Sequence, residues 1–395
     1  MSRSAPGDVA AVVLAGGASR RFGRDKLAEP VGAESLLATA VHGLPSGVRL
    51  VVVGPTPHPV PAELGGARFV REEPVGGGPA AAVVAGLRAA LLGPADLIAV
   101  LPGDAPLAGR AATELLGRLT DHPEAFAVVA VDPDGRDQPL QLALRRLAAE
   151  ALIVAAGVSG GAGTSARGLI AVLEPPPLRH RLTRAAVFDI DTPGQLDSWR
   201  LQGSGPVQRI LNAVRVLAPR SPAVVAVDGP SGAGKSTLAA ALALAGDAVV
   251  IAGDDFYNPA VPGLDAAGRD RWSDAEVADR VFDWRRLRAE ALVPLAEGAV
   301  ARYRPYDWLA GDGRLAPVRR LGAQPLVVLE GVYAGRPELA DRVDLAVCLG
   351  VDPTRRHARL ASRGDDPELA RFWERGERHY FTHIRRPDDF DLTLP

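Results

Sequence analysis

Two glycine-rich segments, each preceded by an apolar run and each containing a lysine, have the residue types that a phosphate-binding loop needs. They span residues 14–26 and 228–237. Because glycine has no Cβ, backbone N–H groups in such a segment can approach phosphate oxygens closely. A lysine ammonium adds a compact positive charge that holds the same oxygens. The sequence therefore predicts two separate sites for phosphate esters.

Lysine occurs only in these two segments. Of the 45 basic residues, Lys26 and Lys235 are lysine and all the others are arginine. A guanidinium group is a wide planar fork, so it cannot replace an ammonium group in a narrow phosphate site. The positions of both lysines therefore favour phosphate binding over a merely structural turn. In the first segment, Arg20 and Arg21 add further positive charge, which suits a triphosphate.

Further glycines and a carboxylate follow the first segment in the chain. Residues 77–79 form a second glycine-rich stretch, and Asp104 comes shortly after an apolar run at residues 97–101. Ligands of α/β sheets bind at the carboxyl ends of the strands. Asp104 is therefore placed where it can take part in a ligand site.

Together, these features resemble the signature of the molybdenum cofactor guanylyltransferases, a family of nucleotidyltransferases. The resemblance extends over residues 8–200. It implies transfer of GMP from GTP to molybdopterin, with release of pyrophosphate. Relatives of this family use CTP, so the base is left open. The resemblance implies catalytic roles for Lys26 and Arg20 and nucleotide contacts by Leu14, Ala15, Gly16, Gly17, Lys26 and Gly78.

The same resemblance implies a metal ligand and an acceptor side. Asp104 would bind Mg²⁺, and Asp191, within residues 188–193, would be a second contact to the metal or the substrate. Residues 138–140 would face the acceptor. Nucleotidyl transfer depends mainly on positioning and on charge neutralisation. The arginines and the lysine of the first segment would neutralise the leaving pyrophosphate.

The second segment has the spacing Gly-x4-Gly-Lys-Ser, between an apolar run at residues 224–227 and an Ala/Leu-rich stretch at residues 238–244. This strand–loop–helix context makes the motif a reliable sign of nucleotide binding. Backbone amides and the helix N-terminus surround the phosphates. Lys235 would reach the β- and γ-phosphates, and the Ser236 hydroxyl would bind Mg²⁺. The predicted contacts are Gly229, Ser231, Gly232, Ala233, Gly234, Lys235, Ser236 and Thr237.

Later features make the second half, residues 222–395, resemble the uridine kinases. They are three segments, 253–257, 304–308 and 326–331, and a basic stretch with Arg355, Arg356, Arg359 and Arg363. The resemblance implies an ATP-dependent phosphotransferase.

By that resemblance, Asp254 is the general base for an acceptor hydroxyl, and Glu330 helps to hold Mg²⁺. Arg363, together with Arg359, would bind the transferring phosphate. The alternative interpretation is that these arginines lie on a solvated helix face and contact no ligand.

The acceptor of the second half is open. Tyr257 and Tyr306 are either substrate contacts or core aromatics. Uridine kinases have a histidine, shortly after the Tyr-Asp-aromatic triplet, that recognises the pyrimidine edge. This sequence has Leu-Ala-Gly after Trp308 and no histidine there. We therefore expect a small nucleoside-like acceptor with a hydroxyl group, not specifically uridine.

Apolar runs alternate with Ala/Leu-rich stretches throughout, which is typical of parallel α/β layers. We predict two three-layer α/β domains: a Rossmann-like nucleotidyltransferase (residues 1–203) and a P-loop kinase fold (residues 222–395). A linker and a helix at residues 207–217 would lie between them. The predicted strands are residues 9–14, 50–53, 97–101, 127–131, 186–190, 224–227, 249–251, 326–329 and 345–349.

Composition restricts the partners. The formal net charge of -2 argues against a basic surface for nucleic acid or for an anionic membrane. The single cysteine, Cys348, excludes an internal disulfide and fits a reducing compartment. No apolar run approaches the ~20 residues needed to cross a bilayer. We expect a cytoplasmic protein that binds small molecules, and the oligomeric state is left open.

Two other functions are compatible with these motifs. The second half could be a GTP-binding accessory protein of molybdenum cofactor assembly, or the whole chain could be a nucleotide-binding regulator without turnover. The segment after the second predicted strand has no Lys-x-x-His-His pattern, which argues against the accessory protein. Binding alone requires no general base, so the presence of Asp254 favours a kinase.

Overall fold

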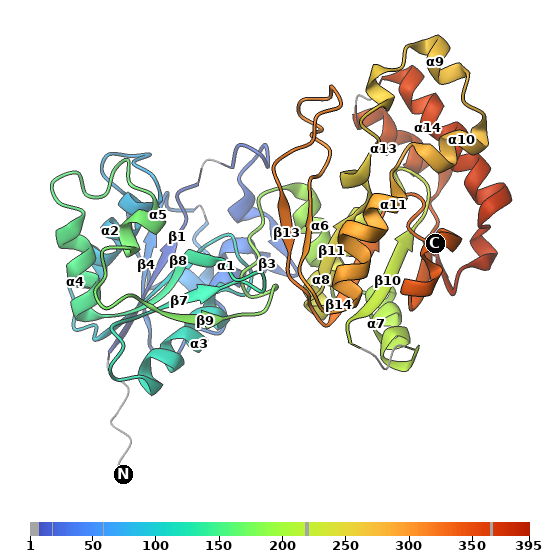
Figure 1. Cartoon of the computed structure of the whole chain (residues 1–395). Helices are drawn as coiled ribbons and strands as arrows, with labels where there is room; N and C mark the ends of the chain where they lie inside the picture. Colours follow the sequence, from blue (N-terminus) through green and yellow to red (C-terminus); the bar gives the residue numbers. More distant parts are fainter. Residues whose placement is uncertain (1–7, 18, 58, 218–220, 364–365) are drawn as a thin grey trace. The chain divides into compact units, whose positions relative to one another are not determined.

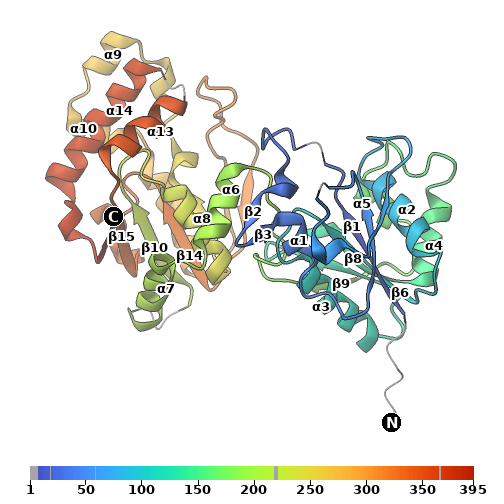
Figure 2. The same ribbon diagram turned by 180° about the vertical axis from the view of Figure 1, so that it is seen from behind.

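The computed structural model describes residues 8–17, 19–57, 59–217, 221–363 and 366–395. The chain divides into two compact units, Met1–Leu196 and Asp197–Pro395. Each unit contains a β-sheet with helices packed against it (Figure 1; Figure 2 gives the view from behind). Among the described residues, no helix has the length and the apolar character to cross a bilayer.

The described part of the first unit has a seven-stranded sheet in the order β5-β4-β1-β6-β8-β7-β9. All of its strands are parallel except β8, which pairs antiparallel with both β6 and β7. A small hairpin of β2 (Pro30–Val31) and β3 (Glu34–Ser35) stands apart from the sheet. The strands are β1 (Val9–Leu14), β4 (Arg49–Val53), β5 (Arg68–Val70), β6 (Leu97–Pro102), β7 (Ala127–Val131), β8 (Asp137–Arg145) and β9 (Leu178–Arg181).

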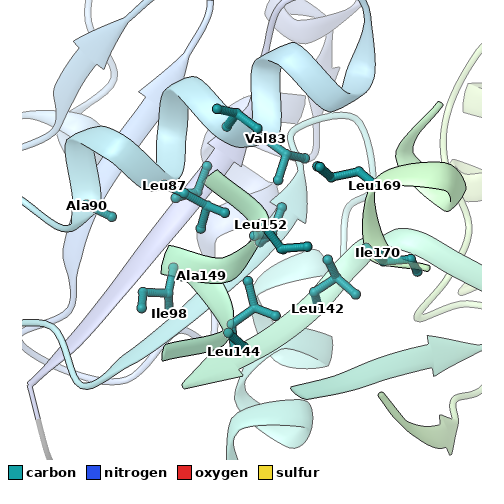
Figure 3. Packing of buried hydrophobic residues seen from close by; sticks show 14 of the residues in the cluster. Val83, Leu87, Ala90, Ile98, Leu142, Leu144, Ala149, Leu152, Leu169 and Ile170 are labelled. Atoms are coloured by element: carbon teal, nitrogen blue, oxygen red, sulfur yellow. The ribbon is translucent and has the colours of Figure 1, made fainter. Parts of the chain in front are cut away.

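Helices cover both faces of this sheet, as predicted for three layers. On one face lie α2 (Pro79–Ala90), α4 (Arg146–Ala155) and α5 (Ala166–Ile170), and on the other lie α1 (Leu36–Val41) and α3 (Ala108–Asp121). Figure 3 shows the first face, where apolar side chains of the helices fit between those of the strands. Strand β1 is buried on both faces, which explains its continuous apolar sequence.

The prediction of a strand at residues 186–190 is wrong. The structure has no strand there, and the edge strand β9 ends earlier, at Arg181. The Ile190 N–H donates to the Asp104 carbonyl at 2.9 Å instead of joining a strand ladder. Its backbone hydrogen bond is therefore used to hold the segment beside Asp104. Strand β8 was also not predicted, because its first residues are polar and lack the apolar pattern of a buried strand.

The second unit has a five-stranded parallel sheet in the order β11-β14-β10-β15-β16 in its described residues. The predicted strands of this half are all present, with ends shifted by at most one residue. Only β16 and a separate antiparallel hairpin of β12 and β13 were missed. The strands are β10 (Ala223–Asp228), β11 (Val249–Ala252), β12 (Ala301–Tyr303), β13 (Arg319–Leu321), β14 (Leu326–Glu330), β15 (Leu345–Leu349) and β16 (Leu392–Leu394).

Two helices, α7 and α8, pack on one face of this sheet, and the helical segment from α11 to α12 covers the other. A second group of helices contains α10 packed against α14, with α9 and α13 nearby (Figure 1). The helices are α6 (Pro193–Leu201), α7 (Gly205–Leu217), α8 (Lys235–Gly246), α9 (Ala266–Asp270), α10 (Asp274–Arg280), α11 (Trp284–Arg286), α12 (Val293–Ala296), α13 (Pro353–Arg363) and α14 (Pro367–His379).

Helix α2 approaches the first sheet so closely that Gly86 has no room for a side chain. A Cβ at this position would lie 2.1 Å from Val12 Cγ1 and 2.9 Å from Val53 Cγ2. We predict that Gly86→Ala lowers the free energy of unfolding of the first unit by about 1–3 kcal/mol, because the core must shift. Hydrogen exchange of the β1 and β4 amides measures this change.

Gly117 in α3 is the matched control, because a Cβ there meets nothing within 4 Å. Replacing a helical glycine by alanine without a clash should stabilise the unit by about 0.5–1 kcal/mol. Equal effects of the two substitutions would contradict the tight packing of α2.

Candidate functional site

The first glycine-rich segment forms an open loop at the carboxyl end of β1. The Ala15 N–H donates to the Val53 carbonyl at 2.8 Å, which fixes the start of the loop against β4. Gly16 and Gly17 are exposed, and a Cβ on Gly17 would meet nothing within 4 Å. The loop therefore presents backbone to the surface, as an anion-binding loop requires.

Lys26 lies at the centre of the first site. It is 6% exposed, and its Nζ is 2.7 Å from Asp104 Oδ2 and 2.6 Å from Asp191 Oδ1. Burial alone would lower the pKa of Lys26, but these two carboxylates outweigh burial and raise it. Three residues predicted from distant parts of the sequence are thus brought into direct contact.

Arg20 and Arg21 of the first segment differ in their surroundings. Arg21 Nη1 is 4.0 Å from Asp191 Oδ2. Arg20 lines a cavity of about 1050 Å³ together with Gly17, Ser19 and other residues of the first unit.

Gln138, in the segment predicted to face the acceptor, donates to Asp132 Oδ2 at 3.1 Å.

The second glycine-rich segment forms a loop between β10 and α8. Gly229 has φ +142° and a Cβ there would lie 2.4 Å from the Leu349 carbonyl oxygen, so only glycine fits. Gly234, at φ +99°, precedes the first helical residue, Lys235. Lys235 is 8% exposed, and its Nζ donates to the Pro230 carbonyl at 3.0 Å. The turn between Gly229 and Gly234 contains Ser231, Gly232 and Ala233. Ser236 and Thr237 follow in the first turn of α8.

Two carboxylates and a hydroxyl meet beside this loop. Ser236 Oγ donates to Glu330 Oε2 at 3.2 Å, and Glu330 stands at the end of β14, next to β10. Burial, and then the negative charge of Asp254, raise the pKa of Glu330 to about 7. Oxygen atoms of Ser236 and Glu330 are the kind of ligands that Mg²⁺ prefers, so this pair fits a magnesium ion, with the Asp254 charge nearby.

Aromatic side chains form one wall next to Asp254. Trp308 Nε1 donates to the Asp254 carbonyl at 3.2 Å. The Tyr257 ring lies 5.0 Å from the ring of Tyr306 and 4.9 Å from that of Trp308, between centroids. Both tyrosines are buried, whereas Trp308 is 48% exposed. Of the three rings, Trp308 is thus the most accessible to a ligand.

The arginines predicted to bind the transferring phosphate lie on α13. Arg359 Nη1 donates to the Gly232 carbonyl at 3.0 Å, which places it against the second loop. Arg363 is the last residue of α13, and its side chain lies outside the described part of the structure.

Comparison with known proteins identifies the first domain. Residues 11–174 match the family model described as "MobA-like NTP transferase domain". The chain is 38% identical over 154 residues to a protein of Mycobacterium avium (strain 104) named "Probable molybdenum cofactor guanylyltransferase". That match covers 38% of this chain and 76% of the relative. This chain belongs to the MobA-like NTP transferase family. Its first domain therefore takes a nucleoside triphosphate as substrate.

Solved structures also resemble parts of the chain, at low identity. Molybdopterin-guanine dinucleotide biosynthesis protein A from Archaeoglobus fulgidus is 20% identical with a TM-score of 0.36, over 48% of this chain and 96% of that one. A possible uridine kinase from Bacillus stearothermophilus is 17% identical with a TM-score of 0.38, over 48% of this chain and 97% of that one.

The MobA-like domain contains two acidic residues that the sequence reading did not assign. Burial, and then the charges of Asp104 and Asp191, raise the pKa of Asp189. Asp189 thus adds a third carboxyl group close to Asp104 and Asp191, and carboxyl oxygens are the ligands that Mg²⁺ prefers. Glu72 is 8% exposed and accepts the Gly76 N–H at 3.1 Å. Its Oε2 lies 3.7 Å from the place of a Cβ on Gly16, so Glu72 borders the loop.

Gly78 takes the position before α2 that the resemblance implied for a nucleotide contact. Its φ of +96° is a conformation that side chains rarely adopt, and a Cβ there would meet nothing within 4 Å. The N-terminus of α2 is therefore open beside Glu72. The spacing of the glycines could identify this feature, whereas no local pattern identifies Glu72 or Asp189.

Two aspartates organise the second site, and the sequence reading assigned a role to neither. Asp228, at the end of β10, is fully buried and accepts the N–H groups of Gly229, Tyr333 and Gly335 and the Tyr380 hydroxyl. Asp255 accepts the Tyr303 hydroxyl at 2.7 Å and pairs with Arg319 at 2.5 Å, which ties the β12–β13 hairpin to the turn beside Asp254. Apart from the bond with Gly229, these contacts are between residues far apart in sequence.

Glu330 makes the stability of the second unit depend on pH. The pKa of Glu330 is about 7 in the folded protein, whereas its ordinary value is 4.5. Between these two pH values, Glu330 therefore retains a proton in the folded protein that it releases in the unfolded chain. The folded state then binds more protons, so the free energy of unfolding falls as pH rises, by about 3 kcal/mol in all. We predict that Glu330→Gln removes this dependence, measured by denaturation of the metal-free protein across this pH range.

Glu297→Gln, which also removes a glutamate charge but from an exposed position, is the control. This variant should keep the pH dependence of the parent protein. If Glu330→Gln and Glu297→Gln have equal profiles, Glu330 does not retain a proton in the folded state.

Proposed function

We propose that the first domain transfers GMP from GTP to a molybdopterin-type acceptor and releases pyrophosphate. The observation that carries this proposal is the contact of Lys26 with Asp104 and Asp191 beside an exposed glycine loop. The M. avium relative, named as a molybdenum cofactor guanylyltransferase, supports the choice of acceptor. An acceptor phosphate oxygen would attack the α-phosphorus, and the bond to pyrophosphate would break.

Lys26, with Arg20 and Arg21, would neutralise the charge that develops on the leaving pyrophosphate. Mg²⁺ bound by Asp104, with Asp191 or Asp189, would supply charge neutralisation at the phosphates. The protein's own contribution is to hold the triphosphate on the backbone amides of the loop. Positioning of this kind accounts for most of the catalysis in such transfers.

Glu72 supports guanine as the base. A carboxylate accepts hydrogen bonds with both oxygens, and guanine has two adjacent donors, N1–H and the N2 amino group. Cytosine has one amino donor beside an acceptor nitrogen, so it pairs less well with a carboxylate. Glu72 is buried beside the loop, where its Oε1 accepts the Gly76 N–H and its Oε2 lies near Gly16.

Asp104→Ala tests this function. We expect the rate of pyrophosphate release from GTP in the presence of molybdopterin to fall by about a hundredfold or more, because an electrostatic contact to the reacting phosphates is lost. Pyrophosphate is measured enzymatically, and the product is identified by mass spectrometry, with CTP tested alongside GTP. Retained turnover would remove Asp104 from the reaction, and a CTP product would correct the base.

Asp121→Ala, at the exposed C-terminal end of α3, is the matched control. It removes the same group from the same unit, so it should leave both turnover and thermal stability unchanged.

For the second domain, we infer an ATP-dependent kinase that phosphorylates a hydroxyl of a small nucleoside-like acceptor. The observation that carries it is the group formed by Asp254, Ser236 and Glu330 next to the second loop. Asp254 would accept the proton of the acceptor hydroxyl, whose oxygen then attacks the γ-phosphorus of ATP. Lys235 and the loop amides would hold the phosphates, with Arg363 and Arg359 at the transferring group. Trp308 offers an exposed ring on which a planar acceptor could stack.

Asp254→Asn separates this kinase from a protein that only binds nucleotides. ADP formation with a mixture of uridine, cytidine, adenosine and guanosine should fall by about a hundredfold or more, because the general base is lost. The thermal shift caused by Mg²⁺ and ATP should be retained. Asp270→Asn, at an exposed end of α9, should change neither measurement.

Lys235→Ala should abolish the ATP-induced shift of the second unit, because the charge at the phosphates is lost. A larger shift with GTP than with ATP in the parent protein would instead favour a GTP-binding accessory. Binding of ATP without ADP formation from any acceptor would favour the regulator.

A further inference from the structure

Helix α13 is seated on the second loop almost entirely by polar contacts. Among residues 353–361 of the helix, whose side chains are described, none is fully buried, and only Arg356 and Leu360 are half-buried. Arg356 Nε donates to the Ser231 carbonyl at 3.0 Å, and Arg359 donates to the Gly232 carbonyl at 3.0 Å. Because apolar burial contributes little, the position of α13 depends on these contacts.

A buried carboxylate from another helix completes this arrangement. Glu377, on α14, is 5% exposed. Its Oε2 accepts the Ser231 N–H at 3.1 Å, and its Oε1 accepts the Ser231 hydroxyl. The same Oε2 lies 3.2 Å from Arg356 Nη2. One carboxylate therefore holds both the turn of the loop at Ser231 and the arginine that seats α13.

We propose that Glu377 is a positioning residue that couples helix α13 to the phosphate loop of the second domain. This inference rests on the proposed nucleotide binding at that loop. Charge-assisted hydrogen bonds to a buried carboxylate are strong and directional, so Glu377 sets the geometry of Ser231 before a nucleotide arrives. Arg359 Nη1 lies 3.3 Å from the position that a Cβ on Gly234 would take. Arg359 therefore lies over the loop that would bind the phosphates.

Arg356 explains why a buried anion is tolerated beside a site for phosphates. Its guanidinium neutralises Glu377 and at the same time occupies the Ser231 carbonyl. Removing only one partner of such a pair leaves an uncompensated charge, which is costly. Loss of the Glu377 charge should therefore release Arg356, and with it α13, while the strands of the sheet keep their own contacts.

Limited proteolysis of the full-length protein with trypsin measures the seating of α13. The helix contains exposed Arg355 and Arg359, and cleavage there is identified by mass spectrometry. When cleavage is slow compared with detachment and reattachment of the helix, the cleavage rate follows the fraction of molecules in which α13 is detached. We expect Glu377→Gln to be cleaved in α13 about tenfold faster than the parent protein without nucleotide, because charge-assisted hydrogen bonds are lost. Mg²⁺ with ATP should slow cleavage in the parent and have less effect in the variant.

Glu374→Gln is the matched control, because Glu374 lies on the same helix, is exposed and is only 3.4 Å from Arg356 Nη1. It should leave the cleavage rate unchanged. Lys235→Ala should lose the protection by ATP.

The outcomes distinguish the inference from the function on which it rests. If ATP gives the parent protein no protection but Glu377→Gln still accelerates cleavage in α13, nucleotide binding fails and the seating role stands. Equal cleavage of Glu377→Gln and Glu374→Gln would overturn the inference. Accelerated cleavage spread over the strands of the sheet would also overturn it, because Glu377 would then support the fold as a whole.

Discussion

A site for a metal-bound triphosphate must gather carboxylates, which repel one another, close to phosphates, which repel them too. An ammonium group placed among these charges makes the assembly stable before the ligands arrive. In the first domain, Lys26 has this position, in contact with Asp104 and Asp191. In the second, Lys235 is buried at the end of the loop, and its charge lowers the pKa of Glu330 against the effect of burial. Both sites depend on the placement of one small cation.

The parallel sheets bring these charges together. Strands β1 and β6 are neighbours in register, so the loop after Leu14 and the turn with Asp104 emerge side by side. In the second unit, β10 and β14 are neighbours in the same way, which places the second glycine-rich loop next to Glu330. Because parallel strands end at the same edge, residues about a hundred positions apart become contacts without any local signal between them.

This explains what could be predicted. The buried strands and the glycine loops were predictable, since apolar runs and glycine spacing are local features of the sequence. The strand expected at residues 186–190 was wrong because this apolar segment binds the Asp104 backbone and joins no ladder. Asp228 and Glu377 were not assigned, because each acts through partners from other elements, and Glu72 was not assigned, because only the fold places it beside Gly16. Polar residues of this kind acquire their roles only from the tertiary fold.

The two lysines differ in their partners, and the difference affects which ligand each site attracts first. Lys26 is paired with two carboxylates, Asp104 and Asp191, so little of its positive charge is left to attract an anion before a cation binds. Lys235 donates to a neutral carbonyl, and the raised pKa of Glu330 reduces the opposing negative charge near neutral pH. The second loop therefore keeps more of its positive charge for phosphate. In the proposed functions, the same residue type would thus prepare one site for the metal and the other for the nucleotide.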